Sequence, residues 1–505
     1  MKRGLLLVRA DASVAAGTGH VMRCLALAQA WRRAGGDAIF AMAQSTPAIQ
    51  ERLRSEPVEV VIIQGIPGSA DDLRQTIDAA LFDGAEWLVL DGYHFGAHYV
   101  SQLQNVRPLL LIDDNGELES YSSELLLNQN VHARAEMYSK RAPRTRLLLG
   151  PRYTLLRNEF TAYRDWERKV AERGTRVLVT MGGSDPKDLT PRVLAALARL
   201  PIDDLQIRVV VSGSAKNRSE VAATAARFPG RVELMSDASV MAELMAWADF
   251  AIAGAGTTCW EMCLLGLPAI LVVVAGNQRS IAEHLAGIGA AVNAGPAELL
   301  DCSTLAHIAA ELVENKDRRV RMSQVARRLV DGLGSERVCS ALQGRELRLR
   351  LVDESDCRLL FEWADDPAAR AASFHSAVIP WEEHVSWFAE RLRDPRSVIY
   401  IGENAAGHPV GLVRFQIQDV RAVMSVNVAP QFRGQGWGRE LIAFSLRSLA
   451  RESTVRRVEA FVKPDNQASL RVFEASGFRL AGQERVADQA ALLFTWECGN
   501  GTHVG

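Results

Sequence analysis

The strongest constraint on the fold is a short apolar run that leads through a glycine turn into a helical pattern. Leu5–Val8 precedes Gly17-Thr18-Gly19, and the helical pattern then runs from His20 to Arg33. The same order of strand, glycine turn and helix begins at three further places, residues 176–181, 250–253 and 425–428. In such a unit, backbone N–H groups of the turn and of the first helical turn face an anion. We therefore expect α/β domains with phosphate-sized binding sites.

Length and composition indicate several globular domains. The 505 residues correspond to roughly three domains at about 150 residues each. Hydrophobic residues make up 48% of the chain, and the formal net charge of −2 gives no general attraction to nucleic acid or to an anionic membrane. The longest apolar run, residues 264–276, contains a glycine and a proline and is too short to span a bilayer.

The cysteines and the N-terminal segment predict a cytoplasmic location. The seven cysteines are scattered and odd in number, which favours reduced thiols over a disulfide framework. Arg9 and Asp11 interrupt the first apolar run too early for a signal peptide. We expect neither a membrane nor a nucleic acid as a partner.

Residues 1–165 read as a first Rossmann-like domain. Apolar runs alternate with helical patterns, and the candidate strands are residues 5–8, 37–41, 58–63, 87–90 and 109–112. Such runs favour a parallel sheet, whose ligands lie beyond the carboxyl ends of the strands. Three of these ends carry polar residues, Arg9–Asp11, Asp91–His94 and Asp113–Asn115. These residues either converge with His20 on one crevice or only cap turns.

Two histidines in this domain invite a chemical interpretation. His20 begins a helix, where the positive end of the helix dipole disfavours the imidazolium, so we expect a neutral base. His94 and His98 have the spacing of a zinc pair, but the adjacent glutamate of that motif is missing and Gly96 weakens a helix there. We therefore predict no metal site.

Residues 166–340 read as a second Rossmann-like domain. Its candidate strands are residues 176–181, 206–211, 250–253 and 269–274. After the third strand, Gly254–Thr258 opens a helix whose Glu261 is placed to accept both hydroxyls of a ribose; the alternative is a glutamate that only complements the helix dipole. Asn277 and Gln278 follow the last strand as a further polar rim. Two such halves describe a GT-B arrangement.

Residues 1–335 contain four motifs with polar and glycine residues at fixed spacing: Arg9-x-Asp11-x-Ser13, Gly17-x-Gly19-His20-x-x-Arg23, Gly182-Gly183-Ser184-Asp185 and Gly256-Thr257-Thr258-x-x-Glu261. With these motifs, the segment resembles the UDP-sugar hydrolase family of pseudaminic acid biosynthesis. That family, related to the glycosyltransferase that completes the peptidoglycan lipid intermediate, removes UDP from UDP-2,4-diacetamido-2,4,6-trideoxy-β-L-altropyranose without a metal. A transferase with the same architecture is the alternative.

The resemblance implies a role for each matching residue. His20 would activate the attacking water, Asp11 would orient His20, and Tyr93 would line the sugar pocket. The remaining residues would bind the UDP-sugar: Arg9, Ser13, Gly17, Gly19, Arg23, Gly183, Ser184, Gly256, Thr257, Thr258, Glu261, Asn277 and Gln278.

Residues 346–497 combine strands with a glycine-rich loop. Candidate strands at 346–351, 398–402 and 410–416 precede the strand at 425–428, which runs into an Arg-Gly-x-Gly-x-Gly loop and a helix. The pattern Asn466-x-x-Ser469 with Phe473 and Gly477-Phe478 follows. Together these features resemble the GNAT acetyltransferase family, a mixed α/β fold that uses acetyl-CoA. The resemblance implies acetyl-CoA contacts at Val426, Asn427, Val428, Arg433, Gly434, Gln435, Gly436, Trp437, Gly438, Asn466 and Ser469.

One position departs from that family. Many relatives carry a tyrosine as the general acid where this chain has Phe473, and phenylalanine cannot donate a proton. His375, His384 and Glu403 are candidates for the base, although His384 and Trp387 also fit a packed helix face. A non-catalytic domain that senses CoA or a nucleotide sugar therefore stays open.

The order of the two resemblances predicts one bifunctional enzyme. In the pseudaminic acid pathway, acetylation of the 4-amino group of a UDP-amino sugar immediately precedes loss of UDP. We expect the C-terminal domain to acetylate and the N-terminal domains to hydrolyse. The alternative is a different acyl group or a different amino sugar.

Overall fold

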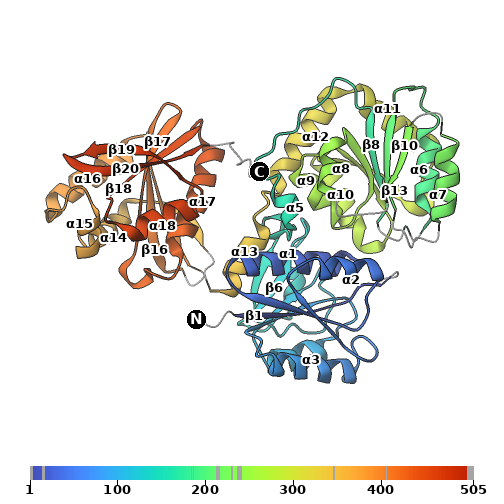
Figure 1. Cartoon of the computed structure of the whole chain (residues 1–505), viewed down its shortest axis with the longest axis horizontal. Helices are drawn as coiled ribbons and strands as arrows, with labels where there is room; N and C mark the ends of the chain where they lie inside the picture. The colour runs from blue at the N-terminus through green and yellow to red at the C-terminus, as the bar shows by residue number, and fades with distance from the viewer. Residues whose placement is uncertain are drawn as a thin grey trace. The chain divides into compact units, whose positions relative to one another are not determined.

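The computed structural model describes residues 4–13, 17–182, 185, 187–211, 217–228, 231–235, 241–344, 347–404 and 407–497. The chain divides into two compact units, residues 1–342 and 343–505 (Figure 1). Each unit is described by itself below.

The first sheet of the first unit is entirely parallel and has seven strands, in the order β3-β2-β1-β4-β5-β6-β7. The strands are β1 (Leu5–Ala10), β2 (Asp37–Met42), β3 (Glu59–Ile62), β4 (Trp87–Asp91), β5 (Leu109–Ile112), β6 (Leu125–Asn128) and β7 (Arg146–Leu149). The helices are α1 (Gly19–Arg33), α2 (Pro47–Arg54), α3 (Ala70–Phe82) and α4 (Ala97–Gln104). All five predicted strands are confirmed, and β6 and β7 were not predicted.

The second sheet is also parallel, in the order β10-β9-β8-β11-β12-β13. The strands are β8 (Arg176–Thr180), β9 (Gln206–Val210), β10 (Arg231–Met235), β11 (Phe250–Gly254), β12 (Ala269–Val273) and β13 (Ala291–Pro296). The helices are α6 (Leu189–Leu197), α7 (Arg218–Ala226), α8 (Met241–Trp247), α9 (Thr258–Leu264), α10 (Arg279–Gly287), α11 (Cys302–Glu314) and α12 (Lys316–Leu329). Two Rossmann-like sheets in one compact unit give the predicted GT-B arrangement.

The chain returns to the first sheet at the end of this unit. Helix α13 (Gly334–Leu342) packs against α1, and Val338 and Leu342 belong to the apolar core of the first sheet. Gly334 permits this return, because a Cβ there would lie 2.1 Å from the Thr154 carbonyl oxygen. The short helix α5 (Asn158–Thr161) lies in the segment that joins the two sheets.

The second unit contains a mixed seven-stranded sheet in the order β14-β15-β16-β17-β18-β20-β19. The strands are β14 (Arg348–Leu351), β15 (Ser397–Glu403), β16 (Pro409–Gln418), β17 (Arg421–Val428), β18 (Arg457–Val462), β19 (Arg479–Val486) and β20 (Gln489–Glu497). The helices are α14 (Cys357–Ala364), α15 (Pro367–Ala372), α16 (Trp381–Arg393), α17 (Trp437–Glu452) and α18 (Gln467–Ala475). The strands and helices expected before residue 450 are present.

Strands β17 and β18 are parallel but pair over only a short stretch. Arg421, Ala422 and Val423 pair with β18, whereas residues 424–428 pair only with β16 on the other side. The backbone of residues 424–428 therefore has an edge outside the sheet ladder, a ready partner for an extended ligand. Among the described residues of the whole chain, no helix is long and apolar enough to cross a lipid bilayer.

Candidate functional site

His20 is the second residue of α1, at the carboxyl edge of the first sheet. The turn before it is closed by backbone hydrogen bonds between Ser13 and Gly17, and Gly17 has a φ of +77° that favours glycine. A Cβ at Gly19 would lie 3.3 Å from Oγ1 of Thr257, which precedes α9 in the half of this unit that contains the second sheet. The two glycine turns therefore approach each other closely, with His20 beside them.

The partner of His20 is Asp91, at the end of β4. His20 Nδ1 lies 2.7 Å from Asp91 Oδ1, and Asp91 is fully buried. Although burial alone would raise the pKa of Asp91, the Arg23 guanidinium and His20 lower it below its usual value. An ionised carboxylate only accepts hydrogen bonds, so Nδ1 donates and Nε2 of a neutral His20 is left as the acceptor. This arrangement suits a general base.

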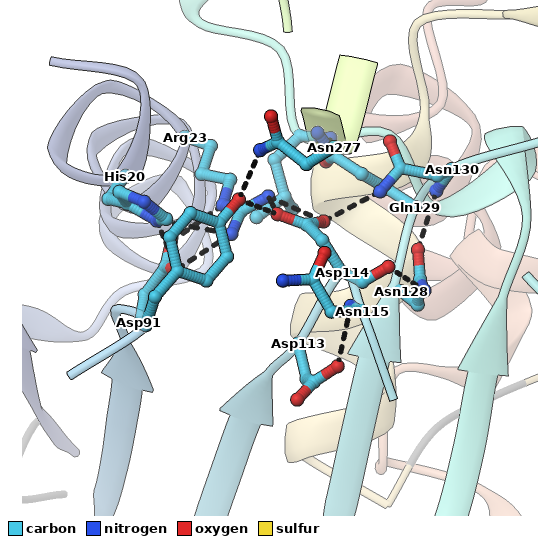
Figure 2. Close-up of polar contacts among 12 residues, drawn as sticks. His20, Arg23, Asp91, Asp113, Asp114, Asn115, Asn128, Gln129, Asn130 and Asn277 are labelled. Atoms are coloured by element: carbon cyan, nitrogen blue, oxygen red, sulfur yellow. Dashed lines mark hydrogen bonds and ion pairs between the residues drawn. The ribbon is translucent and has the colours of Figure 1, made fainter. Parts of the chain in front are cut away.

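Arg23 connects two strand ends (Figure 2). Its Nε and one terminal nitrogen donate to Asp91 at 2.6 and 2.7 Å, and its other terminal nitrogen donates to both oxygens of Asp114 at 3.0 and 2.9 Å. Asn130 Nδ2 also donates to Asp114, at 2.7 Å. Arg23 is therefore saturated by protein carboxylates. Arg23 holds Asp91 in place, and its expected contact with the UDP-sugar stays a prediction.

Tyr93 brings the two halves together at this point. Its hydroxyl donates to Asp114 Oδ2 at 3.0 Å and accepts from Asn277 Nδ2, which follows β12 of the second sheet, at 3.1 Å. Its ring meets the His20 ring edge-on, with 4.7 Å between centroids. Burial and the Asp114 charge raise the pKa of Tyr93 above its usual value, so the phenol stays protonated. Tyr93 is 53% exposed and free to line a ligand site.

Asp11 does not contact His20, which corrects its expected role. Its Oδ1 accepts from the backbone N–H groups of Ala43 and Gln44 at 2.7 and 2.8 Å, and its Oδ2 lies 3.1 Å from His94 Nε2. Asp11 therefore faces the end of β2, whereas His20 lies beside β4. Asp91 takes the role that the sequence motif suggested for Asp11.

Arg9 is likewise part of the scaffold. It is 0% exposed, donates to both oxygens of Asp72 at 2.9 and 2.7 Å, and forms an ion pair with Asp11 at 2.8 Å. These partners occupy the guanidinium and leave it no surface toward a ligand. Arg9 thus fixes Asp11 and α3 instead of contacting a UDP-sugar.

The second half contributes the turn before α9 and the turn after β12. Gly256, Thr257 and Thr258 are partly exposed, and no side chain caps the start of α9. Gln278 accepts from the Val274 N–H at 2.9 Å and holds its own turn, while Asn277 reaches Tyr93. Glu261 lies one turn into α9 and accepts from Arg157 at 2.8 Å. Of these residues, Thr257 is the one that lies within 4 Å of the Cβ position of Gly19.

The glycine turn after β8 is described only in part. Gly183 and Ser184 lie outside the described residues. The neighbouring Asp185 is buried and accepts from the N–H groups of Leu189 and Thr190, both at 2.9 Å. It therefore caps α6.

The polar residues at the ends of β4, β5 and β6 contribute more to this site than the sequence motifs indicated. Of the two alternatives left open, Asp91 and Asp114 follow convergence with His20, because hydrogen bonds through Arg23 connect them. Asn130 was missed, because β6 was not predicted and its polar end carried no motif. A polar residue directly after a buried parallel strand is the signal that would have found it.

In the second unit, the expected cofactor loop follows the free edge of β17. Arg433 donates to the Val428 carbonyl oxygen at 3.0 Å and pairs with Asp366 at 2.7 Å. Gly434 and Gly436 have φ values of +72° and +89°, which shape the turn before α17. Gln435 is exposed and Gly438 packs near Val428. Trp437 is buried in the core, so only its backbone can face a ligand.

The other expected cofactor contacts have visible structural roles. Asn427, in the free edge between Val426 and Val428, donates to the Trp363 carbonyl oxygen at 2.7 Å. Asn466 caps α18 by accepting from the Ser469 N–H at 3.1 Å. Phe473 packs in the core, with 5.0 Å between its ring centroid and that of Phe478.

The three candidate bases of this unit differ in their surroundings. His384 is buried among aromatic rings, and its Nε2 lies 3.1 Å from the Cys357 carbonyl oxygen. Burial lowers the pKa of His384, and this hydrogen bond only partly opposes the shift. Glu403 is paired with Arg350 at 2.6 Å, and His375 is exposed. The packed-face interpretation therefore holds for His384. In the described part of the chain, no three acidic, histidine or cysteine side chains form a metal-binding group.

Comparisons with known proteins agree with this division of the chain. Residues 346–479 match the acetyltransferase (GNAT) domain family, and residues 176–332 match the glycosyltransferase family 28 C-terminal domain. The first match supports the expected use of acetyl-CoA.

Three relatives cover different shares of the chain. An uncharacterized protein of Methanocaldococcus jannaschii is 22% identical over 93% of this chain and 95% of its own length. The spore coat polysaccharide biosynthesis protein SpsG of Bacillus subtilis is 27% identical, over 66% and 96% respectively. The UDP-2,4-diacetamido-2,4,6-trideoxy-β-L-altropyranose hydrolase of Campylobacter jejuni is 26% identical, over 56% and 97%. The chain thus joins a GT-B unit homologous to this UDP-sugar hydrolase to a GNAT acetyltransferase domain, as expected of an enzyme that acts on nucleotide sugars.

Proposed function

We propose that the first unit hydrolyses UDP-2,4-diacetamido-2,4,6-trideoxy-β-L-altropyranose to UDP and the free sugar. The observation that carries the proposal is the His20–Asp91 pair, held by Arg23 beside Tyr93 and Asn277. A neutral imidazole with one nitrogen fixed on a carboxylate is a suitable base for water. The homology to the Campylobacter jejuni hydrolase supports the substrate.

The proposed reaction gives each of these residues a role. His20 Nε2 takes a proton from water while the water oxygen bonds to the anomeric carbon. The bond between that carbon and the diphosphate oxygen breaks, and its electron pair leaves with UDP. Asp91 stabilises the imidazolium that forms, and the Tyr93 phenol and Asn277 bind the sugar. Gly256, Thr257, Thr258 and Glu261 hold the UDP.

The GNAT domain is proposed to acetylate the 4-amino group of the UDP-amino sugar with acetyl-CoA. The free edge of β17 would pair with the pantetheine arm, and the Arg433–Gly438 loop would bind the pyrophosphate. The amine attacks the thioester carbonyl, and CoA leaves as the thiol. The product is the substrate of the first unit, so one chain carries two consecutive steps of pseudaminic acid biosynthesis.

Mass spectrometry of products tests both activities. The full chain is incubated with synthetic UDP-4-amino-4,6-dideoxy sugars, with and without acetyl-CoA. Free acetylated sugar and UDP are expected only when acetyl-CoA is present, and His20→Ala should stop at the acetylated UDP-sugar while still binding UDP. Acetyl-CoA binding without CoA release on any amino sugar would instead favour a sensing domain, for which the buried Phe473 is the supporting observation.

A further inference from the structure

Arg157 lies in the segment that joins the two sheets, and its side chain reaches into the second half. It is 7% exposed, and one terminal nitrogen lies 2.8 Å from Glu261 Oε1. Its other terminal nitrogen pairs with Glu159 at 3.2 Å. No described residue donates a hydrogen bond to Glu261 Oε2. Arg157 therefore occupies one carboxylate oxygen of Glu261 and leaves the other available.

The backbone around Arg157 is fixed by the first half. The Leu155 N–H donates to Gln129 Oε1 at 2.9 Å, the Leu156 N–H to Ser335 Oγ at 3.2 Å, and the Asn158 N–H to Gln29 Oε1 at 2.9 Å. The backbone next to Arg157 is thus held by residues that pack with the first sheet, whereas its guanidinium contacts Glu261 on α9 beside the second sheet.

The buried environment of Glu261 favours a positively charged partner such as Arg157. Burial raises the pKa of Glu261, and the Arg157 charge opposes that shift. A glutamate side chain has several rotamers, and a charge-assisted hydrogen bond to a buried guanidinium favours one of them. Without Arg157, Glu261 would lose this hydrogen bond and the positive charge that opposes the rise of its pKa.

We propose that Arg157 is a positioning residue that presents Glu261 to the ribose diol and so makes the nucleotide site selective for ribonucleotides. The proposal rests on the proposed function, in which Glu261 holds the UDP. In this proposal, the segment between the two sheets acts together with α9 in recognising the ribose of the nucleotide.

The test compares the affinities of UDP and 2′-deoxy-UDP by isothermal titration calorimetry on the full chain. Wild type should prefer UDP by about tenfold, the effect of one hydrogen bond to a carboxylate. Arg157→Gln should reduce this preference to about twofold, mainly by weakening UDP binding. Arg157→Lys, which keeps a positive charge, should retain part of the preference. Glu159→Gln is the matched control, because it removes the other partner of Arg157 and should leave the preference intact.

Two results would overturn the proposal, and each has its own meaning. If Arg157→Gln or Arg157→Lys weakens the binding of UDP and 2′-deoxy-UDP equally, the preference is unchanged. Arg157 would then be only part of a structural ion pair. Equal affinity of wild type for both nucleotides would remove Glu261 from ribose recognition, and with it the role of Arg157. Hydrolysis by wild type, measured in parallel, shows whether the proposed function itself fails. Thermal melting of each variant identifies loss of folding.

Discussion

The two units prepare their sites in different ways. In the first unit, polar side chains from α1 and from the ends of β4, β5 and β6 bind one another: His20 and Arg23 hold Asp91, and Arg23 and Asn130 hold Asp114. In the second, His384 is packed and Glu403 is paired with Arg350, and the backbone edge of β17 and its glycine loop are open to a ligand. The first unit therefore supplies chemistry from side chains, and the second supplies a backbone frame for a reactive cosubstrate.

The largest effect is expected at Asp91. Asp91→Asn should lower UDP release about a thousandfold, because the amide cannot stabilise the imidazolium that forms at His20. Steady-state assay of UDP measures it. The matched control is Asp11→Asn, which should cost less than tenfold since Asp11 faces β2 and His94. Equal losses in the two variants would contradict the assignment of Asp91.

A buried charge outside the reacting groups should affect stability instead. Asp72→Asn leaves the fully buried Arg9 without its two-point partner and should cost about 3 kcal/mol of unfolding free energy. Urea unfolding followed by circular dichroism measures the change. Asp71→Asn, at an exposed neighbour, is the control with an expected change below about 0.5 kcal/mol. If Asp72→Asn leaves the free energy of unfolding unchanged, Arg9 does not stabilise this part of the fold.

In the second unit, a substitution of Arg433 tests whether the glycine loop after β17 binds acetyl-CoA. Arg433→Ala should raise the KM for acetyl-CoA about tenfold with little change in kcat, because the guanidinium would bind the cosubstrate without taking part in acyl transfer. Thiol release at varied acetyl-CoA concentration gives both constants. Arg396→Ala, on an exposed arginine paired with Asp394, should change neither. A drop in kcat alone would argue against a binding role.

The smallest effect on activity is expected at His384. His384→Gln should leave acetyl transfer within about twofold, because this side chain is packed and not reactive. A hundredfold loss would make His384 a catalytic base.

The same substitution has a signature in the pH dependence of stability. Burial lowers the pKa of His384, so the unfolded chain binds a proton that the folded chain resists. Wild type should lose stability as pH falls below about 6.5, the ordinary histidine pKa, and His384→Gln should lose less. Thermal melting at pH 5 and pH 7.5 compares the two slopes, and equal slopes would contradict this origin.

Periodicity predicted β1 to β5 of the first sheet and missed β6 and β7. β6 and β7 each contain three consecutive leucines, and leucine favours helices when isolated; in the sheet, β6 pairs with β5 and β7 pairs with β6. The glycine turns were predictable because a positive φ or a close approach leaves a residue-specific mark, as at Gly17 and Gly19.

Side-chain partners could not be read in the same way. The motif places Asp11 near His20 along the chain, but β1 lies between β2 and β4, and Asp11 turns toward β2. The pairing of Ala10 with Asp91 across β1 and β4 decides which carboxylate lies beside His20. Arg157 was missed for a similar reason, since 104 residues separate it from Glu261.

Hydrolysis in water enriched in oxygen-18 tests the central claim most directly. If His20 activates water against the anomeric carbon, the label should enter the free sugar and be absent from UDP. Mass spectrometry of both products, taken before the sugar exchanges its anomeric oxygen with solvent, reads the result. Label in the terminal phosphate of UDP would place the attack on phosphorus and contradict the account of the site.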